Sequence, residues 1–328
     1  MLFQCDPDLR LARSEIYLDP AEPRRVGIIS HGHSDHIGRH EHFIATPATA
    51  SFLRARIGSS LRGTELQYGE DHQLDGWTIR LHPAGHVLGS AMVHLTSAEG
   101  TLLYTGDFRL EPSFTAEPVG AIIPTADAVI MESTYGGGPE WSFPTREELR
   151  ERLVTLVRDI VRRGRTAVLL AYSLGKAQEV AAMLDGHNLR VVMHPVVAQI
   201  SAIYEKHGSM FGDYEVWSTQ PALFGRRSTV DLRGKAVIVP PHMLSEVRRI
   251  PSSETVSLTG WALRGVRGAD HGLPLSDHAD YGELLRFAEA SHARTVYVTH
   301  GSARFAADLR RRGIRADFLR RKPQMRLF

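Results

Sequence analysis

The chain has 328 residues, of which 42% are hydrophobic and 23% charged, and its formal net charge is +2. This composition is ordinary for a globular protein, the length favours two domains over one, and the near-neutral charge alone does not indicate a nucleic-acid partner. The single cysteine, Cys5, excludes an intramolecular disulfide framework and a thiolate-rich zinc site. No apolar run approaches the roughly 20 residues needed to cross a bilayer, and the N-terminus lacks a signal-peptide pattern. We therefore expect a cytoplasmic protein without a membrane partner.

The first part of the chain is expected to be rich in β-strands. A helix is predicted at 48–57, after Pro47. Short apolar or alternating runs with β-branched or aromatic residues predict the strands of this part, at 15–18, 26–30, 77–82, 91–95, 101–104 and 128–131.

From about residue 145 the pattern changes to alternating helices and strands. Thr145, with Glu148 three residues later, predicts a capping box, and the helix that follows is expected to stop at Gly164. Further helices are predicted at 174–184, 196–207, 279–290 and 303–312, and further strands at 166–171, 191–193, 236–240, 255–259, 295–299 and 316–319. A β-rich first part, an α/β middle and a short α/β tail predict an α/β protein in which one domain is inserted into another.

The stretch Ser30-His-Gly-His-Ser-Asp-His-Ile places three imidazoles and one carboxylate within six residues, just after a predicted buried strand. His31 and His33 alternate with a glycine, so in an extended segment they project to the same side. Asp35 and His36 follow a turn and can face a second ion. Nitrogen and oxygen ligands without sulfur suit zinc, manganese or iron. The alternative, a solvated polar loop, explains this spacing poorly.

Three more candidate ligands lie just after predicted strands and next to glycine. They are His86 in Ala84-Gly-His-Val, Asp107 in Thr105-Gly-Asp-Phe and His300 in Thr299-His-Gly-Ser. Functional side chains are often found where a strand ends in a loop. Taken singly, each residue would more readily be assigned to a cap or to the core. Together with the histidine-rich stretch they can complete two metal shells.

These residues resemble the pattern of the metallo-β-lactamase superfamily. Asp19, in Ile16-Tyr-Leu-Asp-Pro, stands where that family has an aspartate that orients metal ligands. The resemblance implies an αββα sandwich and two divalent ions, with zinc favoured and manganese as the alternative. One ion would be held by His31, His33 and His86, the other by Asp35, His36 and His300, with Asp107 bridging both.

The chain also resembles the β-CASP nuclease branch of that superfamily. The markers are Glu132 in Met131-Glu-Ser-Thr-Tyr-Gly, His278 in Ser276-Asp-His-Ala-Asp-Tyr, and the His-Gly pair at His300. The resemblance implies an α/β β-CASP domain at 138–269, inserted between core parts at 1–137 and 270–328. The run Ser173-Leu-Gly-Lys-Ala-Gln and the segment Thr259-Gly-Trp make the chain similar to bacterial DNA ligase-associated exonucleases in particular.

The resemblance further implies catalytic roles for Asp35, Asp107, Glu132 and His278. His278 would lie beside the metals and protonate the departing sugar oxygen, while Glu132 accepts a hydrogen bond from the other ring nitrogen and fixes the tautomer. The alternative for His278 is a residue at the start of the helix at 279–290.

A contact with the nucleic-acid backbone is predicted at Ser173 and Lys176, where a helix follows a strand and its free N–H groups can hold a phosphate. A plain helix cap with a solvated lysine is the alternative. Four aromatic residues are candidates for stacking on bases, with core packing expected for at least half of them: Tyr135, Trp141, Tyr172 and Trp261.

The predicted function is that of a two-metal phosphodiesterase, most simply a DNA exonuclease in repair that works in one pathway with a DNA ligase or helicase. RNA remains open as the substrate, as in RNase J or the endonuclease that matures mRNA 3′ ends, and so does endonucleolytic cleavage. Two alternatives belong to other classes, a small-molecule metallohydrolase and a catalytically inactive nucleic-acid-binding subunit. Glu132, His278 and the insert disfavour the first, and the complete ligand set disfavours the second.

Overall fold

A computed structural model describes residues 2–6, 8–217, 219–222, 225–228, 231–247 and 250–319. The chain divides into two compact units. Unit 1 consists of Met1–Ser142 and His278–Phe328, and unit 2 consists of Phe143–Asp277. The insert predicted at 138–269 begins and ends earlier in the chain than unit 2, and its assignment as a domain stays a prediction.

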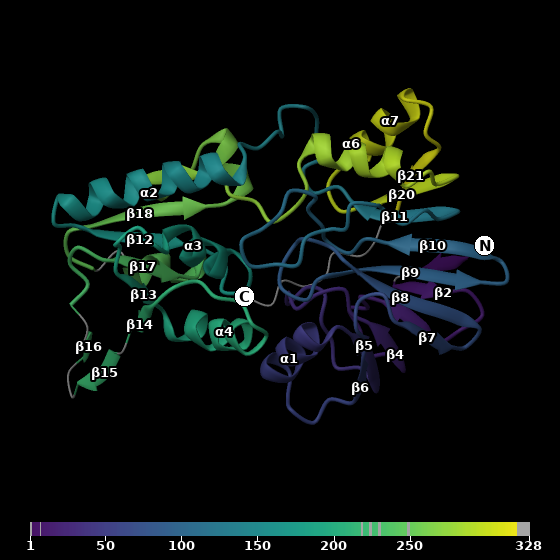
Figure 1. Cartoon of the computed structure of the whole chain (residues 1–328), viewed down its shortest axis with the longest axis horizontal. Coiled ribbons are helices and arrows are strands. Elements are labelled where there is room, and N and C mark those ends of the chain that lie inside the picture. Colours follow the sequence, from purple (N-terminus) through teal and green to yellow (C-terminus); the bar gives the residue numbers. More distant parts are fainter. Residues whose placement is uncertain are drawn as a thin grey trace. The chain divides into compact units, whose positions relative to one another are not determined.

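Unit 1 contains two β-sheets (Figure 1). Within the described residues the first sheet has the strand order β1 (Phe3–Cys5), β2 (Leu9–Leu11), β3 (Ile16–Leu18), β4 (Val26–Ile28), β5 (His42–Ala45) and β6 (Gly63–Glu65). The second has the order β21 (Ala316–Phe318), β20 (Thr295–Thr299), β11 (Ala128–Glu132), β10 (Gly100–Tyr104), β9 (Ala91–Ser97), β8 (Trp77–Pro83) and β7 (Asp71–Leu74).

The inner faces of these two sheets share one hydrophobic core. Because successive side chains on a strand point to opposite faces, each strand gives every second residue to that core. The first sheet contributes Leu9, Leu11, Ile16, Leu18 and Ile28, and the second contributes Ile79, Leu81, Val93, Leu95, Leu102 and Ile130. The burial of this apolar surface holds the two sheets face to face.

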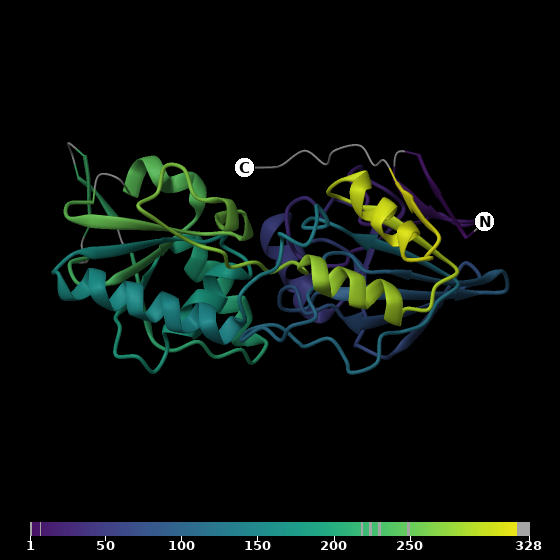
Figure 2. The ribbon, with the colours of Figure 1, turned by 90° about the horizontal axis from the view of Figure 1, so that it is seen from above.

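Helices cover the outer faces of both sheets. Helix α1 (Pro47–Arg56) packs Ala50 and Leu53 against the first sheet. Helices α6 (Tyr281–Ala290) and α7 (Ala303–Arg311) lie next to each other over the second sheet (Figure 2). The layers are therefore helix, sheet, sheet and helix, which confirms the predicted αββα sandwich.

Five of the described strands of the second sheet run in the same direction, β21 among them because it is parallel to β20. Strands β8 and β10 are both antiparallel to β9, and β10, β11 and β20 pair in parallel. The C-terminal ends of β8, β10, β11 and β20 consequently meet at one edge of the sheet. The loops that leave this edge contain His86, Asp107 and His300, and Glu132 is the last residue of β11.

Unit 2 is built on a parallel sheet. Within the described residues its strand order is β14 (Tyr214–Val216), β13 (Val191–Met193), β17 (Ala236–Val239), β12 (Thr166–Leu170), β18 (Ser253–Leu258) and β19 (His271–Leu273). A hairpin of β15 (Thr219–Ala222) and β16 (Gly225–Ser228) lies outside this sheet. The helical elements are α2 (Arg146–Arg162), α3 (Lys176–Leu184), α4 (Pro195–Lys206), η1 (Pro241–Met243), α5 (Leu244–Val247) and η2 (Gly260–Arg264).

Most of the predicted elements are present within a few residues of their expected bounds. The capping box at the start of α2 forms as predicted, with Thr145 and Glu148 each accepting from the backbone of the other. Strands β1, β2, β5, β6, β7, β14 and β19 and the hairpin were not predicted. None of the helices in the described parts of the chain is long and apolar enough to span a bilayer.

Candidate metal centre

The loop after β4 brings three histidines together. His31 is fully buried, and its Nε2 lies 3.1 Å from Nδ1 of His33. A turn in which the His36 N–H donates to the His33 carbonyl, at 3.1 Å, then directs His36 back toward the same region. The predicted pairing of His31 and His33 on one side of the loop is therefore present.

His86 comes from the loop after β8, which is closed by Ser90. The Ser90 hydroxyl accepts the N–H groups of His86 and Val87, each at 3.2 Å. Gly85 has a φ of +74°, and a Cβ there would lie 2.1 Å from the Arg109 carbonyl oxygen. Only glycine fits this position, so the loop needs it in order to bring His86 to the other ligands.

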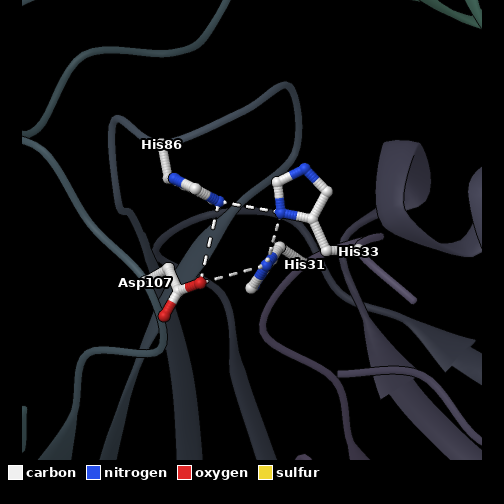
Figure 3. Close-up of side chains that lie close together, drawn as sticks. All are labelled: His31, His33, His86 and Asp107. Atoms are coloured by element: carbon white, nitrogen blue, oxygen red, sulfur yellow. Dashed lines mark hydrogen bonds and ion pairs between the residues drawn. The ribbon is translucent and has the colours of Figure 1, made fainter. Parts of the chain in front are cut away.

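His31, His33, His86 and Asp107 form the first cluster (Figure 3). Nε2 of His86 lies 3.0 Å from Nδ1 of His33, and Oδ2 of Asp107 lies 3.6 Å from Nε2 of His31 and 3.9 Å from Nε2 of His86. One ligand atom from each of these residues therefore points to a common centre, as tetrahedral metal sites require.

His36, Asp107 and His300 form the second cluster. Nε2 of His36 lies 3.4 Å from Oδ2 of Asp107, and Nδ1 of His300 lies 3.6 Å from Oδ1. The carboxylate of Asp107 thus turns one oxygen to His300 and the other to the first cluster. Burial opposes charge on both Asp107 and His36. Their mutual attraction nevertheless holds the pKa of Asp107 well below its usual range and, together with Asp19, the pKa of His36 well above.

Asp35 belongs to neither cluster. It is half-buried on the turn between His33 and His36. Burial disfavours its charge, yet the imidazoles of His36 and His33 hold the pKa of this carboxyl below its usual range. Its electrostatic environment is that of the metal site, and its assignment as a ligand stays a prediction.

Asp19 holds a histidine of each cluster, His36 directly and His31 through Ser30. It is fully buried after β3 with a φ of +40°, and it accepts from the Ser30 N–H at 2.7 Å and from the Ser30 hydroxyl at 2.6 Å. Nδ1 of His36 lies 2.8 Å from the same carboxylate, and Nδ1 of His31 lies 2.9 Å from the Ser30 oxygen. With Nδ1 donating to these oxygens, each ring would present Nε2 to a bound ion.

His278 and Glu132 lie beside the clusters. Nδ1 of His278 is 2.9 Å from Oε1 of Glu132 and 3.9 Å from Oδ2 of Asp107. Glu132 also accepts the backbone N–H groups of Phe108 and Thr134, which fix the carboxylate. The start of α6 is capped by Asp280 in a capping box with Glu283, so His278 is not the cap of that helix.

Comparison with known proteins agrees with this arrangement. Residues 5–159 match the family model of the metallo-β-lactamase superfamily, and residues 268–318 match that of the Zn-dependent metallo-hydrolase RNA specificity domain. The chain belongs to the metallo-β-lactamase superfamily. The succession of these two domains also assigns it to the β-CASP branch, whose members are metal-dependent hydrolases.

Curated relatives cover different shares of the chain. A protein named probable DNA ligase from Opitutus terrae is 38% identical over 92% of this chain and 29% of its own length. The transcription termination factor FttA from Pyrococcus horikoshii is 39% identical over 37% of the chain, and RNase aCSPSF2 from Saccharolobus solfataricus is 32% identical over 37%. The chain spans less than a third of the length of each of these relatives.

The residues of the two clusters fit divalent ions. Nε2 of His36 and Oδ1 of Asp107 are both buried and make no hydrogen bond, although buried polar atoms are nearly always paired. A cation between these residues would satisfy both atoms. The donor set of imidazole nitrogens and carboxylate oxygens, without a thiolate, suits zinc or manganese.

Two residues of the centre were not predicted from the sequence. The Tyr104 hydroxyl donates to Asp19 at 2.8 Å, and buried Arg109 donates to the His278 carbonyl at 3.2 Å and to Glu111. Tyr104 reads as the end of an apolar strand, and Arg109 follows the Gly-Asp-Phe run without a pattern of its own. The signal that could have been used is its position two residues after Asp107, a predicted metal ligand, since an arginine buried there would need a partner.

Ser173 and Lys176 lie in unit 2, at the start of α3. Ser173 is half-buried, whereas Lys176 is only 5% exposed and its Nζ is paired with Asp277 at 3.0 Å. The solvated lysine of the alternative reading is thus not observed, and the phosphate contact stays a prediction. Of the four candidate stacking residues, Tyr135 and Trp141 are buried against each other, and Tyr172 and Trp261 are exposed.

Proposed function

We propose that the chain is a two-metal phosphodiesterase that cleaves DNA, acting as an exonuclease in DNA repair. The observation that carries the proposal is the pair of His278 and Glu132, 2.9 Å apart beside Asp107. A proton donor held next to a metal cluster is what cleavage of a phosphodiester requires, because the departing sugar oxygen must be protonated.

Two divalent ions are proposed, zinc before manganese. His31, His33 and His86 would hold one, and Asp35, His36 and His300 the other, with Asp107 shared between them. The membership of Asp107 in both clusters supports this division. Bound there, the ions would neutralise charge on the phosphate and lower the pKa of a water molecule toward neutrality.

The chain's own groups then act on the substrate. Glu132 accepts a hydrogen bond from Nδ1 of His278, so the imidazole presents Nε2 to the leaving group and donates the Nε2 proton there. Glu132 also favours the charged imidazolium that can give this proton. Asp107 and Asp35 complete the catalytic set through the ions, and Asp19 keeps His31 and His36 in the tautomer that can bind them.

DNA is favoured by a relative that is similar to 92% of the chain. The similar region amounts to 29% of a protein named probable DNA ligase, so in that polypeptide it is joined to further sequence. This supports a nuclease that trims DNA ends in the pathway in which a ligase or helicase acts. We also keep Ser173 and Lys176 as part of a contact of unit 2 with nucleic acid.

RNA processing is the second candidate. It is favoured by the match of residues 268–318, which include His278 and His300, to a domain model named for RNA specificity. The partial similarity to RNase aCSPSF2 points the same way.

The test is cleavage of end-labelled DNA and RNA of one sequence, single-stranded and duplex, by the purified protein with Zn²⁺ or Mn²⁺. We expect metal-dependent cleavage of DNA that proceeds from an end and spares a closed circle. Faster cleavage of RNA would transfer the proposal to the second candidate. Absence of metal-dependent cleavage of any of these substrates would overturn both.

A further inference from the structure

Two exposed aromatic side chains follow neighbouring strands of the sheet in unit 2. Strands β12 and β18 pair in parallel, with Leu170 opposite Ser257, so both end at the same edge. Tyr172 comes two residues after β12 and Trp261 three residues after β18. Their relative exposures are 55% and 54%.

The side chain of Lys176 packs against the ring of Tyr172. Nζ of Lys176 lies 5.1 Å from the centroid of that ring, within the range of a cation–π contact. Lys176 is itself fixed by the ion pair with Asp277 at 3.0 Å, and it is almost fully buried. The ring is therefore exposed but oriented, and little conformational entropy would be lost when a flat ligand covers it.

Trp261 lies in a segment with basic and no acidic residues. It belongs to η2, whose N-cap Thr259 accepts the Trp261 N–H at 3.4 Å. Arg264 and Arg267 follow, both exposed, and residues 255–269 contain no Asp or Glu. Aromatic faces together with arginines are the combination that single-strand-binding proteins use, the rings for bases and the guanidinium groups for phosphates.

We propose that Tyr172 and Trp261 form a stacking site for the unpaired bases of a single-stranded nucleic acid, with Arg264 and Arg267 contacting its phosphates. The proposal rests on the proposed function, and it adds that the segment bound by unit 2 is single-stranded. In a duplex the faces of the bases are covered by their neighbours, so only unpaired bases can stack on the two rings. It also gives Lys176 a role, as a residue that orients Tyr172.

The test measures binding of fluorescent oligo(dT) and oligo(U) to the metal-loaded protein by anisotropy, in a His278→Ala background that prevents cleavage. Trp261→Leu and Tyr172→Leu should each weaken binding by roughly 5- to 150-fold, the range of base–aromatic stacking. Lys176→Met should weaken it less. A matched control is Phe114→Leu, an aromatic residue of unit 1 that is 40% exposed, and its affinity should not change.

A second readout separates stacking from a structural role. Trp77 and Trp141 are buried and Trp217 is half-buried, so Trp261 is the exposed tryptophan of the described residues. Stacking of a base on it should quench intrinsic fluorescence, and Trp261→Phe should remove the quenching while it retains part of the affinity.

The outcomes distinguish this proposal from the function on which it rests. Unchanged affinity of both leucine variants, in a protein whose parent cleaves DNA, would overturn the stacking site and leave the nuclease standing. If binding is weakened in these variants but the protein with His278 intact cleaves no nucleic acid, the stacking site stands and the proposed nuclease function is overturned. Absence of binding by the parent to either oligonucleotide would overturn the stacking site.

Discussion

Nδ1 of His278 lies 2.9 Å from Oε1 of Glu132, although 146 residues separate the two in sequence. Two backbone N–H groups also donate to this carboxylate, which keeps it in place. With the carboxylate as acceptor, Nδ1 of the imidazole donates and Nε2 is left to face a substrate. The pair therefore defines where a proton can be delivered.

Replacement of either member should lower turnover and preserve the metal sites. We expect His278→Ala and Glu132→Gln each to reduce kcat by about 10²–10⁴-fold, the usual contribution of general acid catalysis. End-labelled DNA assays give kcat, and elemental analysis gives bound metal per chain. A variant that loses metal along with activity would show that the residue is a ligand, in contradiction to the role proposed here.

Arg109 should matter for both stability and turnover. Its guanidinium donates to the His278 carbonyl and is paired with Glu111, so Arg109→Met leaves buried polar groups without a partner. We expect the free energy of unfolding in urea to fall by about 3 kcal/mol. We also expect kcat to fall with KM for DNA nearly unchanged, because His278 is displaced.

The matched control for Arg109 is Arg304→Met, which removes an exposed ion pair with Glu140 at 3.7 Å. Exposed pairs contribute about 1 kcal/mol or less. Equal effects of the two substitutions on stability and kcat would refute a positioning role for Arg109.

Tyr104→Phe should weaken metal binding without touching a ligand. The substitution removes the hydroxyl that donates to Asp19 at 2.8 Å and keeps the buried ring. Loss of such a partner of a ligand-orienting group typically costs about 10–100-fold in metal affinity. A competition titration with a chelator measures this change. Tyr17→Phe is the control, since its hydroxyl donates to Glu15 at the surface, and affinities equal to that control would contradict the prediction.

Because of His40, the free energy of unfolding should fall as the pH is lowered into the mildly acidic range. Burial lowers the pKa of His40 to about 4, and its Nδ1 accepts the Arg24 N–H at 3.3 Å, a bond that the protonated ring cannot make. Below its ordinary pKa of about 6.5, the unfolded chain takes up a proton that the folded chain refuses. The free energy of unfolding therefore falls as the pH drops from 6.5 to 4, by at most about 3 kcal/mol.

The contribution of His40 is isolated by comparison with His40→Gln. The other histidines titrate in both proteins, so the difference between their urea-unfolding free energies across this pH range reports on this ring alone. We expect the variant to lose less stability than the parent as the pH falls. Parallel curves for the two proteins would count against the prediction.

The clustering of His86, Asp107 and His300 with the histidine-rich loop could be predicted because each combines two local signals, the end of an apolar strand and an adjacent glycine. His86, Asp107 and His300 all follow strands that run in one direction. Once these strands are recognised, the three residues are expected to lie close together at one edge of the sheet. The long helices were predictable for the same reason, since capping and periodicity are local.

The remaining features depend on partners that are distant in sequence. The hydrogen bond from Tyr104 to Asp19 joins residues 85 positions apart, and the sequence around either residue does not predict it. Strand β7, Asp71–Leu74, alternates between exposed and half-buried residues and has no apolar face. Such an edge strand is defined by its pairing with β8 and not by its composition.

The order of the segments in unit 1 bears on how the protein is made. Strand β11 pairs with β20, and Phe305 and Leu309 of α7 pack with Val129 and Met131, yet all of Phe143–Asp277 lies between these partners in the chain. A ribosome must therefore synthesise the whole of unit 2 before this part of unit 1 can close. Until then Glu132 has no His278 and Asp107 has no His300. The proposed nuclease can begin to cut only after unit 2, His278 and His300 have all been synthesised.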